Sequence, residues 1–66
     1  MKPIQNVLKQ VREDKNYTQK QIADYLNITQ QAYANYESGK RLIDIEKLKK
    51  LADLYQISLD ILSGRY

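Results

Sequence analysis

Apolar residues recur at the spacing of an α-helix along the whole chain, and this pattern restricts the fold more than any other feature of the sequence. The first helix should begin after Pro3 and end near Asn16. Its apolar face follows the i, i+3, i+4, i+7 spacing and consists of Ile4, Val7, Leu8 and Val11. No segment alternates apolar and polar residues as a half-buried strand would. The sequence therefore predicts an all-α fold.

Residues that start and stop helices separate the next two segments. The stretch 18–21 has the pattern of a capping box and starts a second helix, which Asn27 ends because asparagine tolerates the left-handed backbone conformation. Thr29 caps a third helix that should run to about Ser38 and stop at Gly39. Two helices joined by a tight turn are therefore expected within residues 18–38.

Two further helices are predicted in the C-terminal third. Asp44 starts the fourth, and Ser58 caps a short fifth helix that Gly64 stops. The chain contains no linker, internal repeat or low-complexity segment. We therefore expect one domain over residues 1–66 with about five helices.

Composition excludes several kinds of site. The 66 residues contain no cysteine and no histidine, so the commonest metal ligands and the commonest acid-base catalyst are missing, and no cofactor or metal is expected. The net charge of +3 is compatible with a polyanionic partner but is also common in unrelated proteins. The N-terminal stretch lacks the apolar core of a signal peptide, and no run approaches the ~18 apolar residues of a membrane span. A cytoplasmic protein without a membrane partner is expected.

The third helix has two different faces. On a helical wheel Tyr33 and Tyr36 share the side expected to face the core, with Glu37 beside them. The other side is uncharged and amide-rich, and it carries the candidate base-contacting residues Gln30, Gln31, Ala34 and Asn35. A glutamine or asparagine amide pairs a donor with an acceptor, which matches the N6 and N7 edge of adenine in the major groove. The competing interpretation is that this polar face is simply solvated.

Positive charges lie at the edges of this face. Lys40 and Arg41 follow the third helix, and Lys20 lies in the first turn of the second helix, whose free N–H groups can bind an anion. The candidate phosphate contacts are Thr18, Gln19, Lys20, Ser38, Lys40 and Arg41. The lysines of the fourth helix alternate with acidic residues, so ordinary surface ion pairs explain them. Amides in the middle and cations at the rim suit a DNA duplex.

The stretch TQKQIADYLNITQQAYANYESGKR resembles the helix-turn-helix of the phage repressor and Cro-like (XRE) family. The similarity extends through VREDKNYTQ on one side and KLADLYQISLDILSG on the other, and it implies a compact five-helix lambda-repressor-like domain. The resemblance further implies that Gln19 binds a backbone phosphate and that Gln30, Gln31 and Asn35 reach base edges. It also implies an ion pair, buried or half-buried, between Arg12 and Glu37.

The sequence departs from the usual family pattern at several positions. Asn27 and Gln56 stand where the family more often has glycine, and Tyr33 and Tyr36 stand where it more often has aliphatic residues. A buried tyrosine needs a partner for its hydroxyl group, so we expect at least one of these phenols to reach the rim of the domain. A phosphate contact from Tyr33 is one hypothesis, and a role in the core is the other.

The function expected from these features is sequence-specific binding of double-stranded DNA by a transcriptional regulator, a repressor, with the third helix in the major groove. The protein would be encoded by a bacterium or phage and associated with the nucleoid. A homodimer on an inverted-repeat operator is expected, because one such domain reads only a few base pairs. The candidate dimer surface consists of Leu54, Leu59, Ile61, Leu62 and Tyr66, although these residues could instead complete the core of the monomer.

Two alternative functions are considered. In the first, the protein is an antitoxin or protein-protein adaptor, and DNA binding is secondary. In the second it is an enzyme, which would need a nucleophile with a base or two facing carboxylates. Ser38 and Ser63 have no histidine partner, and Glu13 and Asp14 are adjacent at a helix end. We therefore expect no catalysis and no small-molecule ligand.

Overall fold

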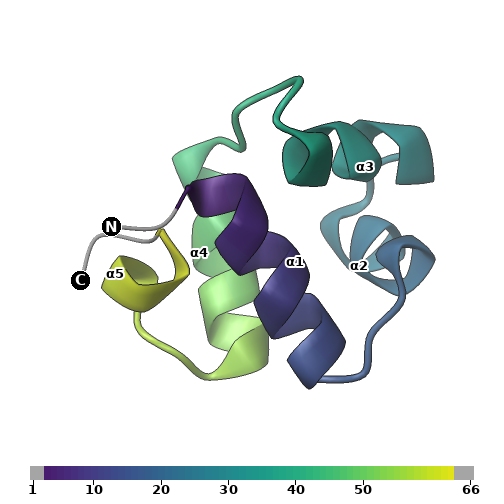
Figure 1. Ribbon diagram of the computed structural model, residues 1–66. Helices are drawn as coiled ribbons and strands as arrows, with labels where there is room; N and C mark the ends of the chain where they lie inside the picture. Colours follow the sequence, from purple (N-terminus) through teal and green to yellow (C-terminus); the bar gives the residue numbers. More distant parts are fainter. Residues whose placement is uncertain (1–2, 64–66) are drawn as a thin grey trace.

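The structure is a computed structural model that describes residues 3–63, which form five α-helices and no strand (Figure 1). The helices are α1 (Ile4–Asp14), α2 (Gln19–Leu26), α3 (Gln30–Ser38), α4 (Ile45–Tyr55) and α5 (Leu59–Leu62). In Figure 1, α1 crosses the middle of the molecule, with α2 and α3 on one side of it and α4 and α5 on the other. The predicted all-α fold is confirmed. None of these helices has the length and apolar character that crossing a membrane requires.

Short local motifs set the start of α2 and the ends of α2 and α3. The Thr18 hydroxyl accepts from the Gln21 N–H at 3.1 Å, and the Gln21 side chain accepts from the Thr18 N–H at 2.8 Å. This is the predicted capping box. Asn27 ends α2 with φ of 60°, and Gly39 ends α3 with φ of 84°. Both residues adopt the left-handed conformation that lets a helix terminate abruptly.

One helix ends earlier than expected, and the expected stop of another lies outside the described residues. Helix α1 ends at Asp14 rather than near Asn16, because Asn16 takes a φ of 65°. The chain turns there, and the Tyr17 N–H donates to the Arg12 carbonyl group at 3.1 Å. Helix α5 ends at Leu62, and its expected stop, Gly64, lies outside the described residues.

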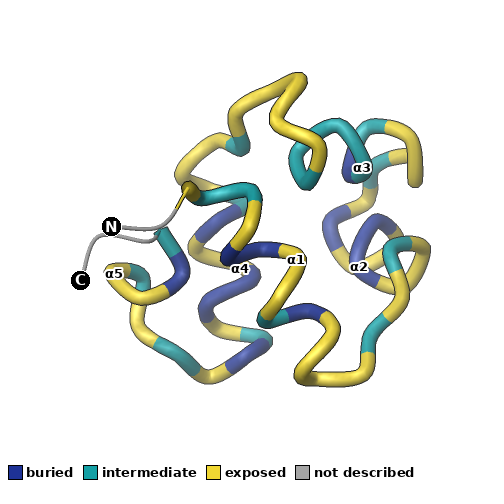
Figure 2. Tube along the Cα trace, viewed as in Figure 1, coloured by how far each residue is buried: buried dark blue, intermediate teal, exposed yellow. Residues whose placement is uncertain are grey.

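One hydrophobic core holds all five helices together. Its buried residues are Val7, Leu8, Ile22, Ala23, Leu26, Tyr33, Leu48, Leu51, Ala52, Tyr55 and Leu62. In Figure 2 every one of the five helices contains buried positions. Leu62 is completely buried, so its expected place on a dimer surface is wrong: the short α5 turns this side chain into the core. Tyr66, also expected on that surface, lies outside the described residues.

The two largest buried side chains are tyrosines. Tyr33 and Tyr55 are 0% and 1% exposed, and neither hydroxyl has a hydrogen-bond partner among residues 3–63. Burial raises the pKa of both phenols well above the usual value, and the charge of the nearby Glu37 carboxylate raises it further. The hypothesis that Tyr33 contacts phosphate is therefore wrong, because its ring and its hydroxyl are inside the core.

Candidate nucleic-acid interface

Helix α3 is fixed to the body of the protein by its inner face. The Thr29 hydroxyl caps it by accepting from the Ala32 N–H at 3.0 Å. Tyr33 is buried in the core, and the half-buried Tyr36 meets it edge to face, with ring centroids 6.3 Å apart. The two tyrosines therefore orient the helix and leave its other face outward.

The outward face of α3 presents amides to solvent. Gln30 and Gln31 are exposed, whereas Ala34 and Asn35 are half-buried. The Gln31 Nε2 donates to Asn35 Oδ1 at 3.2 Å, so two of the candidate base-contacting side chains are hydrogen-bonded to each other. The four residues are uncharged, and the amides among them have the chemistry needed to pair with base edges.

A buried ion pair lies on the inner side of the same helix. Arg12 Nε donates to Glu37 Oε2 at 2.6 Å, and Arg12 Nη2 donates to Glu37 Oε1 at 3.1 Å. The two side chains are only 10% and 4% exposed. Arg12 Nη1 also donates to the Tyr17 carbonyl group at 2.8 Å. This bidentate pair ties α3 to α1 and to the connection that enters α2.

Glu37 accepts a further hydrogen bond from the start of α2. Gln19 Nε2 donates to Glu37 Oε1 at 3.1 Å. Burial by itself would raise the pKa of Glu37, but the hydrogen bonds from Arg12 and Gln19 and the positive charge of Arg12 outweigh it, so the pKa lies below its ordinary value. Glu37 is therefore charged at neutral pH. One amide hydrogen and the backbone N–H of Gln19 stay outside this bond.

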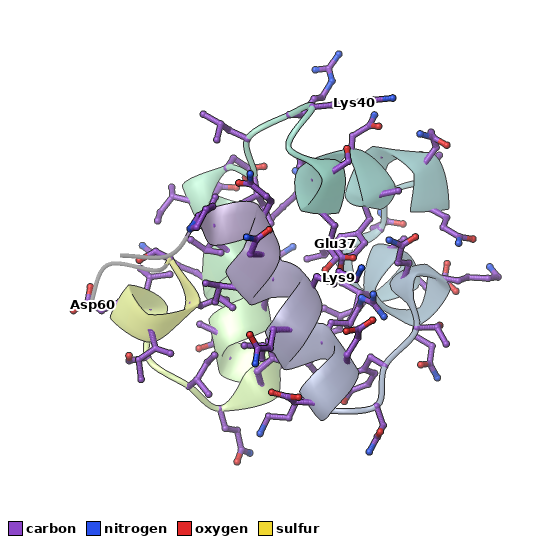
Figure 3. The ribbon with its side chains drawn as sticks, in the orientation of Figure 1. Lys9, Glu37, Lys40 and Asp60 are labelled. Atoms are coloured by element: carbon purple, nitrogen blue, oxygen red, sulfur yellow. The ribbon has the colours of Figure 1, made fainter. Side chains whose placement is uncertain are left out.

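A shallow concavity of about 290 Å³ lies where α1, α2 and α3 meet. It is lined by Lys9, Gln19, Ala34, Glu37 and Ser38. Figure 3 shows Lys9 and Glu37 at this junction, far from Asp60 on α5. The concavity brings together Gln19 and Ser38, two candidate phosphate contacts that come from different helices.

Lys9 is a residue of this site that sequence reasoning missed. In the sequence it stands among the polar residues of an ordinary amphipathic helix, and nothing in α1 alone distinguishes it. Its neighbours in the concavity come from α2 and α3, so only the packing of the three helices reveals its position.

The segment after α3 is held against the end of that helix. The Ser38 hydroxyl donates to the Asn35 carbonyl group at 3.2 Å and accepts from the Lys40 N–H at 3.4 Å, while the Arg41 N–H donates to the Asn35 carbonyl group at 3.2 Å. Lys40 and Arg41 are both exposed, and Figure 3 shows Lys40 projecting from the outer end of this connection. Two cations thus lie at one end of the amide face.

The candidate contacts at the start of α2 are partly engaged within the protein. The Thr18 hydroxyl is used in the capping box, and Lys20 forms an exposed ion pair with Asp24 at 3.4 Å. Such exposed pairs contribute little and break readily. On α4, Lys47 pairs with Asp44 at 3.0 Å.

A model of the helix-turn-helix family matches residues 8–62, which include the amide face of α3, the ion pair and the concavity. The chain belongs to the helix-turn-helix family. The resemblance to phage repressor and Cro-like (XRE) proteins is thereby confirmed.

Several relatives of this helix-turn-helix protein are curated. An uncharacterized prophage-derived transcriptional regulator of Bacillus subtilis, YonR, is 44% identical over 55 residues, which are 83% of this chain and 51% of that protein. The cryptic phage CTXphi transcriptional repressor RstR of Vibrio cholerae is 43% identical over 63 residues, 96% of this chain and 56% of that protein. The chain thus spans about half the length of these relatives.

A solved structure has the same fold. The crystal structure of a transcriptional regulator from Listeria innocua aligns with a TM-score of 0.87 and 34% identity, covering 92% of this chain and 57% of that one. The arrangement of the five helices is therefore shared with a protein that is named as a regulator.

Proposed function

We propose that this helix-turn-helix protein binds a specific sequence of double-stranded DNA and regulates transcription as a repressor in the cytoplasm of a bacterium. The observation that carries the proposal is the outward face of α3, where uncharged amides lie beside the exposed cations Lys40 and Arg41. Relatives named as transcriptional regulators and a phage repressor support it. The proposed role is binding without catalysis.

In the proposed complex, α3 lies in the major groove and its neighbours contact the DNA backbone. Gln30, Gln31 and Asn35 reach base edges, and Ala34 permits close approach. Lys40 and Arg41 contact phosphates at one end of the helix. The concavity at the junction of α1, α2 and α3 accepts another phosphate, contacted by Gln19, Ser38 and Lys9. Thr18 and Lys20 lie beside this second position.

The protein is further proposed to bind as a homodimer on an inverted repeat. Of the expected dimer surface, Ile61 is 42% exposed, and Leu54 and Leu59 are half-buried. The two α3 helices of such a dimer would contact half-sites about one helical turn, roughly 34 Å, apart.

Selection from a pool of randomised duplexes tests the proposal. The purified protein is incubated with the pool at moderate salt, and the bound fraction is sequenced. We expect an enriched inverted repeat with half-site centres about 10 bp apart. A pool without any enriched sequence would contradict DNA-sequence recognition and favour the alternative of an antitoxin or protein-protein adaptor.

A further inference from the structure

The two amides that are hydrogen-bonded to each other on α3 restrict which bases they can read. Gln31 and Asn35 lie one helical turn apart, and the bond runs from Gln31 Nε2 to Asn35 Oδ1. Gln30 cannot enter this pair in the same way, because it is five residues from Asn35 and about 140° away around the helix. The outward face therefore contains one coupled pair and one independent amide.

Counting donors and acceptors shows what the pair still offers to DNA. A primary amide has two N–H donors and one oxygen with two lone pairs. The bond uses one N–H of Gln31, which keeps its oxygen and its second N–H for a ligand. It uses one lone pair of the Asn35 oxygen and turns that oxygen along the helix toward Gln31, so the NH₂ group of Asn35, on the opposite branch of the amide, is the group directed to a base.

We propose that Gln31 and Asn35 read adjacent bases as one unit, in which Asn35 turns its NH₂ group to the base and selects guanine. Guanine presents two acceptors, O6 and N7, in the major groove, whereas adenine presents one acceptor beside its N6 amino donor. Opposite an Asn35 whose oxygen is turned toward Gln31, the adenine amino group meets the NH₂ group and has no acceptor in front of it. Gln31, with its free acceptor and donor, remains suited to adenine. This inference rests on the proposed function and assigns its specificity.

The first test identifies the base that Asn35 contacts. Sites are selected with the wild-type protein and with Asn35→Ala, and the base pair at which the variant loses its preference is assigned to this residue. At that base pair we expect the wild type to favour guanine over adenine by about 5- to 150-fold, the range for one specific side-chain contact. A wild-type preference for adenine there would overturn the inference.

The second test removes the partner of Asn35. Gln31→Leu takes away the donor that engages Asn35 Oδ1 and leaves a side chain of good helix propensity. Asn35 can then present both its oxygen and its NH₂ group, so at its own base pair the preference for guanine over adenine should fall at least fivefold. An unchanged guanine preference at that pair would show that the two residues read independently.

Gln30→Leu is the matched control, because it makes the same change on the same helix outside the pair. It should alter the base pair that Gln30 contacts and leave the guanine preference opposite Asn35 as in the wild type. An equal shift with both leucine variants would contradict a specific coupling. Failure of the wild-type protein to enrich any sequence would contradict the proposed function itself, whereas an enriched site with adenine opposite Asn35 contradicts only this inference. Circular dichroism verifies that each variant keeps its helices.

Discussion

Glu37 binds side chains from two other helices through a single carboxylate. Arg12 reaches it from α1 and Gln19 reaches it from the start of α2, while Glu37 itself lies on α3. The position of α3 relative to the concavity therefore depends on the charge of this residue. Breaking such a buried pair is costly, because the remaining charge is left without a partner.

The pKa of Glu37 predicts an acid-sensitive component of stability. Because the pKa is lower in the folded protein than its ordinary value of 4.5, the unfolded chain takes up the proton first as the pH falls. The contribution is complete above about pH 4.5 and is lost as the pH drops through the folded-state pKa. Urea unfolding between pH 3 and 7 should show this loss, and the NMR titration of the Glu37 carboxyl carbon should lie on the acid side of the ordinary value. A Glu37 titration at or above the ordinary value would contradict it.

Lys40 predicts a sequence-independent component of DNA affinity. Lys40→Gln should weaken binding to all duplexes alike and reduce the slope of log affinity against log salt by about 0.9, because one phosphate contact is lost. Lys50→Gln is the control: Lys50 is exposed on α4, and the contact it provides to Tyr25 is made by its backbone carbonyl group. Equal slopes for wild type and Lys40→Gln, measured by fluorescence anisotropy, would remove Lys40 from the phosphate contacts.

At the scale of the helices, the boundaries were predictable wherever one short stretch determines them. The capping box at 18–21, the left-handed Asn27 and the stop at Gly39 all depend on residues within about four positions of one another. The predicted end of α1, near Asn16, is about two residues too late, because the apolar pattern does not show that the backbone of Asn16 is no longer helical.

The end of α4 contains a conformation that its side chain disfavours. Gln56 has a φ of 57°, in the left-handed region that glycine adopts without a side-chain penalty. A left-handed residue with a side chain costs roughly 1–2 kcal/mol. Gln56→Gly should raise the free energy of unfolding by about 0.5–1 kcal/mol, less than the full cost because glycine also makes the unfolded chain more flexible. Asn27→Gly should gain less, since asparagine tolerates this conformation. Urea denaturation measures both, and a destabilised Gln56→Gly protein would contradict the argument.

At the scale of the whole molecule, residues whose role depends on distant neighbours could not be predicted from the sequence. Lys9 gained its place beside Gln19 and Ser38 only through the packing of three helices. The direction of the Leu62 side chain depends on how α5 contacts α1 and α4, and the apolar sequence pattern of so short a helix does not determine it. Arg12 and Glu37 are 25 positions apart, so their ion pair was predictable from the family resemblance but not from the spacing of the residues.

The proposed dimer gives a prediction at this scale. Ile61→Asp places a charge on the exposed part of α5, and it should abolish self-association and weaken binding to a full inverted repeat while leaving binding to an isolated half-site unchanged. Ile45→Asp is the control, because Ile45 is 54% exposed at the start of α4, outside the proposed surface. Sedimentation velocity separates monomer from dimer. A dimer that persists in Ile61→Asp would place the interface elsewhere.

The inner face of α3 packs against the core, whereas its outer face carries the proposed base contacts. This separation has a consequence for evolution. Tyr33 and Tyr36 fix the helix from the inside, whereas Gln30, Gln31 and Asn35 make no contribution to the hydrophobic core. Substitutions at such surface positions usually change stability by no more than about 0.5 kcal/mol. Within the proposed function, substitutions at these positions can therefore change the DNA sequence that is bound while the fold is kept.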